Sequence, residues 1–430
     1  MPVNNSSWDL AVAEAECRYD LSLKLVKIAY LVVLPPVNVV GLLATAASVR
    51  TFTRPSMLSS LNVYLAAMSA FDFVLLLSSL YVFPMVTLCV LTGNDSICGF
   101  LLSYPLLVLY PAMEVAQCGS TLACLAVTLD RFIAVKLPLR RLRWCCVRQA
   151  KAAVGLILLL SLIYRATSFL EVNVSGNSPV MSSLRSSELY QVIQAYSEMI
   201  LMYCLPVAVM LVLNVLVFWS VKAARRTREI LQPQCSSTAN LELVNGESPG
   251  RRNAKADHVR RRERRCSTMV FLIVLTYALL NLPRPVNDFL EYRWSCPSRC
   301  SACFLLKAAL VVLGNCATCL NSATNFLIYC ALARRFRAAV ADELEAAFCP
   351  ARRRARRRRR DADQLRRQRE AARSLAQAQQ QPSPTRRRAA VTRAPSSRSS
   401  ATHAASGHSS AALTPKYLHS HSSSTSCARL

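Results

Sequence analysis

Seven apolar runs, each long enough to cross a lipid bilayer, constrain this sequence more than any other feature. A helix needs about 20 predominantly apolar residues to span the hydrocarbon core. The clearest run covers residues 104–135 and ends on Asp130 and Arg131. Such runs predict an all-α membrane protein, because a helix satisfies its own backbone hydrogen bonds in lipid. We place the other six runs near residues 25–49, 59–91, 152–172, 197–221, 268–290 and 303–330.

Charges between the runs predict how this seven-transmembrane helix bundle is oriented. The net charge is +28, and the bases gather in the loops after the first, third and fifth runs and in the tail. Positive loops of this kind face the cytoplasm, so we read the charge as membrane topology and expect no nucleic acid partner. Glycosylation sequons at Asn4, Asn5 and Asn173 lie on the other side. We therefore predict an outside N terminus and a multi-pass protein of the plasma membrane.

Four regions follow from this topology. Residues 1–24 are expected to be an extracellular segment, and residues 25–331 the seven-transmembrane bundle. Residues 332–349 carry apolar side chains at helical spacing, which predicts a short cytoplasmic amphipathic helix. It ends at Cys349, a predicted palmitoylation site. Residues 350–430 are rich in Arg, Gln, Ser and Ala, so we expect a disordered cytoplasmic tail whose bases bind anionic lipids.

Asp130 and Arg131 are adjacent where the third run reaches the inner membrane interface. The simpler interpretation is an ion pair that marks the end of a helix. In a seven-span protein we favour a switch, because Arg131 can pair with Asp130 in one state and with another partner in a second state.

Polar side chains inside the runs predict a buried network. A carboxyl near the middle of the bilayer costs roughly 2.5–3.5 kcal/mol, so Asp72 should face the interior of the bundle. Two interpretations stay open: a site for a cation such as sodium, and a hydrogen-bonded network that only packs helices. The predicted members are Asn38, Asp72, Ser120, Asn321 and Asn325, of which the last two lie on one helical face.

Glu114 lies about five helical turns above Arg131, in the outer third of the same run. A buried acid at this depth is either functional or paired, and Arg165 and Arg284 are the candidate partners. With acids near the outer end of the sixth run, Glu114 would form an acidic funnel for a cationic ligand, although such interface residues are often only solvated. The predicted ligand pocket consists of Glu114, Gln117, Asn287, Asp288 and Glu291.

The cysteines and the lack of catalytic motifs limit which other functions the sequence can carry. Cysteines outside the membrane are disulfide candidates whose pairing stays open, whereas those inside the runs, such as Cys89, are expected to act as small hydrophobes. No phosphate loop, HExxH or zinc-ligand spacing occurs. We therefore predict no enzyme, no bound metal site and no cofactor apart from the sodium ion. The disulfide candidates are Cys17, Cys98, Cys296 and Cys300.

These features resemble the rhodopsin-like (class A) G-protein-coupled receptors over about residues 25–348. Within that class, YPAMEVAQCGSTLACLAVTLDRFIAV and LNSATNFLIYC resemble FMRFamide-type neuropeptide receptors. The resemblance implies a peptide ligand outside, with RF-amides as the candidate class, and a heterotrimeric G protein inside. It also implies that Asp130, Arg131, Pro283 and Tyr329 form the activation switch. The residues that carry it are Asn38, Asp72, the DRF sequence at 130–132, Pro206, Pro283 and the NFLIY sequence at 325–329.

The sequence departs from the class pattern at several positions. Phe326 replaces the usual proline of the seventh span, and Asn281 stands where the sixth span usually has tryptophan. The loop before the fifth span lacks its usual cysteine, which puts the signature disulfide in question.

Two alternatives to a neuropeptide receptor stay open. One is a seven-span transporter or channel, and the other is a receptor-like scaffold without ligand-driven signalling. For the receptor we also expect arrestin and receptor kinases as partners of the Ser- and Thr-rich tail.

Overall fold

The computed structural model describes residues 21–92, 95–175, 178–235, 249–293 and 302–348, with helical pieces at 362–366, 368–370 and 372–373. Met1–Arg353 forms one compact unit and Arg354–Leu430 a second, and the bundle lies in the first. Several predicted sites lie outside the described residues: Asn4, Asn5, Cys17, Cys296, Cys300 and Cys349. For Cys98 and Glu291 the structure describes the backbone only.

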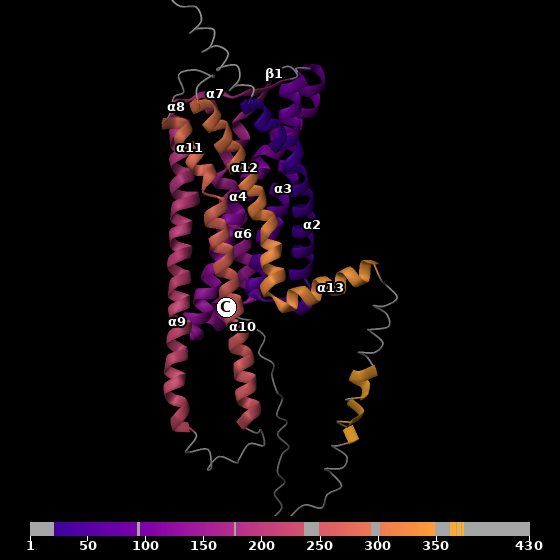
Figure 1. Cartoon of the computed structure of the whole chain (residues 1–430), viewed down its shortest axis with the longest axis vertical. Coiled ribbons are helices and arrows are strands. Elements are labelled where there is room, and N and C mark those ends of the chain that lie inside the picture. The colour runs from indigo at the N-terminus through magenta and orange to yellow at the C-terminus, as the bar shows by residue number, and fades with distance from the viewer. Residues whose placement is uncertain are drawn as a thin grey trace, which may run out of the picture. The chain divides into compact units, whose positions relative to one another are not determined.

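Seven helices in the described chain are long and apolar enough to cross a membrane (Figure 1). Their number and order agree with the seven predicted runs. The fourth is shorter than predicted, because it ends at Tyr164 and a 3-10 turn follows at Ala166–Leu170. The spans are Leu21–Phe52, Ser60–Cys89, Leu102–Lys136, Val147–Tyr164, Glu188–Ala223, Arg265–Leu290 and Leu305–Leu332.

The helical segments have the following bounds. Spans one to four contain η1 (Ile28–Val33) with α2 (Leu34–Phe52), then α3 (Ser60–Thr92), α4 (Asp95–Lys136) and α6 (Val147–Tyr164). Spans five to seven contain α8 (Glu188–Ser197) with η4 (Glu198–Cys204) and α9 (Leu205–Cys235), then α10 (Pro249–Leu280) with α11 (Pro283–Arg293), and α12 (Ala302–Leu332). The connecting and flanking helices are η2 (Pro55–Met57), α5 (Pro138–Trp144), η3 (Ala166–Leu170), α7 (Ser183–Ser186) and α13 (Arg334–Phe348).

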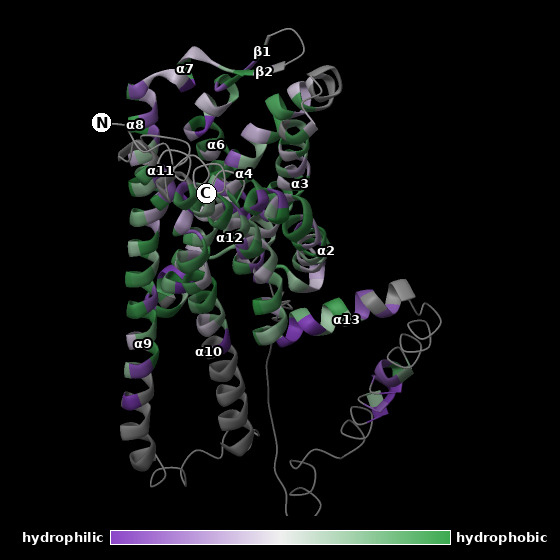
Figure 2. Cartoon of the chain, turned by 45° about the horizontal axis from the view of Figure 1, so that its top comes forward, coloured by the Kyte–Doolittle hydropathy of each residue, from purple (hydrophilic) through white to green (hydrophobic). Residues whose placement is uncertain are grey.

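Burial is distributed as a membrane bundle requires. Charged and amide side chains lie inside, with Asp72 1% and Glu114 2% exposed, whereas Leu43 on the outward face of α2 is 70% exposed. Figure 2 shows apolar residues over the long helices of the bundle and polar residues along α13. Outward apolar faces suit lipid, and inward polar groups find partners on neighbouring helices.

Prolines interrupt three spans and explain their irregular turns. A proline lacks the N–H that would bond to the carbonyl four residues earlier. The wide π-helical turns η1 and η4 lie directly before Pro35-Pro36 and Pro206. In the sixth span, α10 stops at Leu280 and α11 restarts at Pro283, where proline is favoured as the first helical residue.

Two apolar clusters fill the bundle. The inner end is the end that carries Arg131, and its cluster centres on Phe52, Tyr329 and Phe336, whose rings lie 4.9–5.6 Å apart between centroids. Phe336 comes from α13, which crosses the lower end of α12 (Figure 1). The Arg54 side chain holds α13 from the other side, 2.6 Å from Glu343. A second cluster, which includes Leu34, Leu76 and Met113, lies between the first, second, third and seventh spans.

The outer end is closed by a short antiparallel hairpin. Strands β1 (Val172–Ser175) and β2 (Ser178–Met181) pair Val172 with Met181 and Asn173 with Val180. Both strands contact α4, so the hairpin lies against the third span.

Candidate functional site

A buried ion network lies in the outer half of the bundle around Glu114 of α4. Its carboxylate accepts a hydrogen bond from the guanidinium of Arg284, in the first turn of α11. It also forms an ion pair with Arg165, at 3.3 Å between Nη1 and Oε2. Arg165 is 3% exposed and pairs in turn with Glu198, the first residue of η4. Both arginines that the sequence analysis named as candidate partners therefore engage Glu114.

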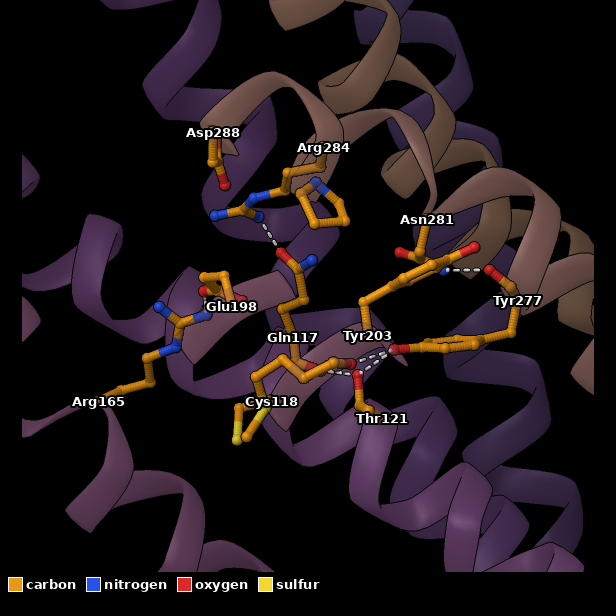
Figure 3. A pocket seen from close by; sticks show the side chains of 12 residues that line it. Gln117, Cys118, Thr121, Arg165, Glu198, Tyr203, Tyr277, Asn281, Arg284 and Asp288 are labelled. Atoms are coloured by element: carbon orange, nitrogen blue, oxygen red, sulfur yellow. Dashed lines mark hydrogen bonds and ion pairs between the residues drawn. The ribbon is translucent and has the colours of Figure 1, made fainter. Parts of the chain in front are cut away.

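A small cavity lies directly beside this network (Figure 3). Arg284 donates a hydrogen bond to Gln117 Oε1 across it, and Asp288 points toward the same guanidinium. The cavity measures about 20 Å³, which holds about one water molecule. A ligand side chain therefore enters only if the surrounding side chains move. The lining residues are Gln117, Cys118, Thr121, Arg165, Glu198, Met202, Tyr203, Tyr277, Asn281, Arg284, Pro285 and Asp288.

The predicted pocket residues are partly brought together. Glu114, Gln117 and Asp288 gather around Arg284. Asn287 is 6% exposed, and its side-chain amide donates to Asp288 Oδ1 at 3.4 Å.

At the floor of the cavity, two tyrosines on neighbouring spans each donate a hydrogen bond to a backbone carbonyl of the other span. Tyr277 of α10 donates to the carbonyl of Met202 at 3.1 Å, and Tyr203 of η4 donates to the carbonyl of Ala278 at 2.7 Å. Met202 lies four residues before Pro206, and Ala278 lies in the last turn of α10, so both carbonyls lack a regular helical partner. The Thr121 hydroxyl of α4 lies 2.9 Å from that of Tyr277. We call these contacts the tyrosine exchange; they join the third, fifth and sixth spans.

A polar clamp on Glu171 fastens the outer hairpin to the bundle. Glu171 is 1% exposed and precedes β1. Its carboxylate accepts hydrogen bonds from Tyr110 of α4 at 3.0 Å, from Tyr190 of α8 at 2.7 Å, and from Arg185. Burial opposes the charge of Arg185, but Tyr110 and Glu171 outweigh it and raise the pKa of that guanidinium. The clamp therefore joins the loop to the third and fifth spans without a disulfide. Asn173, the predicted glycosylation site, is exposed on β1.

Two residues of the predicted polar network, Ser120 and Asn325, converge on Asp72 in the middle of the bundle. Ser120 donates to Oδ1 at 2.7 Å and Asn325 to Oδ2 at 2.9 Å. Ser322 adds a third hydrogen bond at 3.0 Å. The amide oxygens of Asn321 and Asn325 are buried without a hydrogen-bond partner.

Asn38 lies apart from the carboxylate of Asp72. Its amide instead donates to Ser79 of α3 at 2.9 Å.

The predicted switch lies at the inner end of the bundle. Arg131 Nη2 is 2.5 Å from Asp130 Oδ2, and the two are neighbours on one helix. Tyr329 is fully buried against Phe52 and Phe336. Pro283 marks the break in the sixth span, between one and two helical turns outward from Tyr277 of the tyrosine exchange.

Sequence reasoning missed several residues that the structure brings into these sites. Glu198, Tyr203 and Tyr277 carried a weak signal, because each is a polar side chain within a long apolar run. Ser322 carried none, since serine is common in membrane helices. Cys89, expected to act as a small hydrophobe, is disulfide-bonded. The clamp residue Glu171 stands at the end of the predicted fourth run and Arg185 in the loop after it, where charges are ordinary.

Comparison with known proteins agrees with this architecture. The chain is 26% identical to the FMRFamide receptor of Drosophila melanogaster over 315 residues, which cover 70% of this chain and 51% of that receptor. It is 35% identical to the FMRFamide peptide receptor frpr-18 of Caenorhabditis elegans over 133 residues, 31% of each chain. The matches thus span about half or less of these two relatives.

The family assignment rests on a longer match. Residues 44–329 match the family described as 7 transmembrane receptor (rhodopsin family), whose members are receptors and not enzymes. The match covers the predicted switch and every predicted network residue except Asn38, and it disfavours a transporter or channel. With seven spans observed in the described chain, it indicates a multi-pass protein of the plasma membrane. The chain belongs to the rhodopsin family of seven-transmembrane receptors.

Proposed function

We propose that this protein is a receptor for an extracellular neuropeptide of the FMRFamide type and that it activates heterotrimeric G proteins. The observation that carries the proposal is the cavity beside Glu114, where acids and arginines from four spans meet under the outer end of the bundle. The names of the two similar receptors support a peptide with an arginine near an amidated end.

The cationic end of the peptide enters between Glu198 and Asp288. Both acids line the cavity, and Glu114 lies behind them under Arg284. A ligand guanidinium competes with Arg284 for these carboxylates. Because Arg284 lies in the first turn of α11, releasing it changes what holds the sixth span against the third. An agonist shifts the population only through such differential contacts.

The signal passes inward through groups that join the same spans. The tyrosine exchange lies directly below Arg284 in the cavity wall. Asp130 and Arg131 then receive the G protein at the inner end. Pro283 is the hinge of the sixth span, and the ring of Tyr329 changes its packing when that span moves. The span-six movement that results is a recognised type of switching transition.

The residues around Asp72 fit a sodium ion. The carboxylate has no basic partner in the described part of the chain, and Asn321 and Asn325 offer unpartnered amide oxygens. Oxygen donors of this kind suit a hard cation. Asp72 and Ser120 would hold it with those two amides, and the ion would supply positive charge that the network lacks. Asn38 would order the neighbouring helix.

Further parts of the proposal concern the two faces of the membrane. Sugars attach at Asn4, Asn5 and Asn173. Cys349 carries palmitate, and the tail binds arrestin, receptor kinases and anionic lipid. Cys17, Cys98, Cys296 and Cys300 supply disulfides on the outer face.

A paired peptide experiment tests the ligand assignment. Cells that express the receptor with a promiscuous G protein are screened with RF-amide peptides and with the same peptides carrying citrulline, which keeps the shape of arginine without its charge. We expect citrulline to lower potency at least about tenfold, equal to 1.4 kcal/mol. Asp288→Asn should lower potency for the arginine peptide and not for the citrulline peptide.

The control variant for that experiment is Glu343→Gln, which removes an acid at the opposite end of the bundle. Equal potency of the arginine and citrulline peptides would exclude the charge contact. Absence of nucleotide exchange with every peptide pool would favour the scaffold alternative.

A further inference from the structure

A second cavity opens between the inner ends of the second and fourth spans. The proposed peptide site lies in the outer half of the bundle, so the two cavities are separate. The second cavity measures about 470 Å³ and is lined by Tyr64, Arg143, Trp144, Gln149 and Ala153. Tyr64 lies in the second turn of α3, and Gln149 and Ala153 lie in the first two turns of α6. The cavity is therefore at the depth where lipid headgroups meet the hydrocarbon core.

The side chains around this cavity suit a membrane interface. Trp144 is 60% exposed and Leu139, on the same short helix α5, is 88% exposed. Exposed tryptophan and tyrosine are enriched where headgroups lie, because their rings are apolar and their polar atoms stay hydrated. Helix α5 thus lies on the membrane surface with its apolar residues toward lipid.

Charge selects the kind of lipid. Residues 132–164 contain no Asp or Glu. The acid next to this segment, Asp130, is already paired with Arg131. Six bases therefore follow one another without an acid between them, and anionic headgroups of the inner leaflet are attracted to such segments. Arg143 is the base that lines the cavity. The six are Lys136, Arg140, Arg141, Arg143, Arg148 and Lys151.

The outward face of α6 provides a place for acyl chains. Leu156, Leu160 and Ile163 follow Ala153 along the helix and are 54%, 47% and 63% exposed. Leu156 lies three residues after Ala153, and Leu160 follows four residues later, so these side chains continue along one face. A lipid with its headgroup in the cavity would lay its chains over this face.

We propose that this cavity is a binding site for a single anionic phospholipid of the inner leaflet, with its phosphate against Arg143 and its headgroup beside Tyr64 and Trp144. The bound lipid fixes α5. That helix ends at Trp144, and the next residue is Cys145, whose thiol lies 3.9 Å from the backbone carbonyl of Asp130. Lipid composition therefore acts on the segment that carries the Asp130–Arg131 pair. The site needs no peptide and no tail.

Lipid retention in nanodiscs tests the proposal directly. The full chain is reconstituted in phosphatidylcholine with an equal part of phosphatidylserine, and the lipids that remain bound after release are counted by native mass spectrometry. We expect one retained phosphatidylserine. Arg143→Gln removes a direct hydrogen bond to the phosphate, worth about 1.5–3 kcal/mol, so retention should fall more than about tenfold. Arg140→Gln, on the same helix but outside the cavity, removes only general surface attraction and should lower retention about fivefold or less.

Two further measurements distinguish lipid bound in the cavity from lipid attracted only by the surface charge. Ala153→Phe fills the cavity and leaves every charge in place, so it should abolish retention of the lipid even though Arg143 is intact. Phosphatidylserine should slow backbone hydrogen exchange in α5, whereas inorganic phosphate should not. Equal losses in the Arg143 and Arg140 variants would overturn the proposal, as would retention of phosphatidylcholine or a sterol in place of phosphatidylserine. Thermal melting of each variant checks that the bundle is intact.

Discussion

The outer and inner halves of the bundle hold their helices together by different means. In the outer half, buried charges join residues that are far apart in the sequence, such as Glu114 with Arg284 and Glu171 with Tyr110. In the inner half, Asp130 pairs with its neighbour Arg131, and the pair of Arg54 with Glu343 ties only α13 to the first inner loop. Packed rings around Phe336 join the helices there.

This difference separates ion pairs that hold helices together from an ion pair that can change partners. A charge pair between helices resists their separation, because both groups are left in low dielectric when it breaks. A pair between neighbours on one helix breaks without moving any helix. The outer half is therefore built to hold its form until a ligand supplies replacement charges, and the inner half is built to exchange partners. The four predictions below rank thermal stability effects accordingly.

Glu114→Gln should have the largest effect. It leaves Arg165 and Arg284 without their shared carboxylate, and removing one partner of a buried pair costs about 3–5 kcal/mol. We expect a large fall in the melting temperature of the purified receptor and in its surface expression. The same variant should lower agonist potency; unchanged potency would remove Glu114 from the ligand site.

The matched control is the double variant Glu114→Gln with Arg284→Gln. It removes one unpaired guanidinium and leaves Arg165 with Glu198, so part of the stability should return. If the double variant is less stable than the single one, the pair does not hold the spans together.

Glu171→Gln should have the next effect, confined to the outer loop. Hydrogen bonds to a charged group contribute about 1.5–3 kcal/mol, and Glu171 accepts three. Hydrogen exchange of β1 and β2 should accelerate while the inner halves of the spans stay protected. Arg185→Gln should do less, because its side chain is 42% exposed and screened by water.

The clamp should also be insensitive to pH. The raised pKa of Arg185 means that its contribution is fully present below the ordinary pKa of arginine and is lost only above it. Exchange rates of the hairpin, corrected for intrinsic chemistry, should therefore agree between about pH 6 and about pH 9. A marked change in that range would mean that other groups control the clamp.

Tyr277→Phe should cost about 1 kcal/mol, the usual net value of a hydrogen bond. It removes the contacts to Thr121 and Met202 and keeps the ring. Because these contacts hold the sixth span to the third and fifth, basal nucleotide exchange should rise. Tyr203→Phe, which loses only the bond to Ala278, is the matched comparison. Unchanged basal exchange in both variants would exclude the tyrosine exchange from the switch.

Asp130→Asn should have the smallest effect on stability, less than about 1 kcal/mol, because Arg131 can extend its long side chain to water at the inner interface. We expect a melting temperature close to that of the unmodified receptor together with raised basal exchange. A fall as large as that of Glu114→Gln would show that the two halves are held alike.

Much of this architecture was predictable because membrane spans leave a strong signal. Length and apolarity determined the number and order of the helices, and helical spacing placed Asn321 and Asn325 on one face. Asp72 was identifiable because a lone carboxyl in lipid must turn inward. Which helices supply its partners depends on how each span rotates about its axis, so Ser322 escaped notice.

The clamp and the tyrosine exchange were not predictable for a related reason. Tyr203 and Tyr277 bond to backbone carbonyls of the opposite helix, and such acceptors have no sequence identity. Glu171 joins three segments only after the loop folds back through the hairpin. The fourth span ended early because Arg165 turns inward to two acids, a contact that hydropathy does not register.

The π-helical turns before Pro35 and Pro206 also affect how this chain should be aligned with its relatives. A π turn accommodates about one more residue than an α turn, so it rotates the outward part of the helix by about 100° relative to a regular one. An ungapped alignment anchored on these prolines would place outward residues of the first and fifth spans one position out of register. Glu198 and Tyr203 lie within the second of these turns. Equivalences assigned to them from a relative with a regular helix would therefore name the wrong side chains.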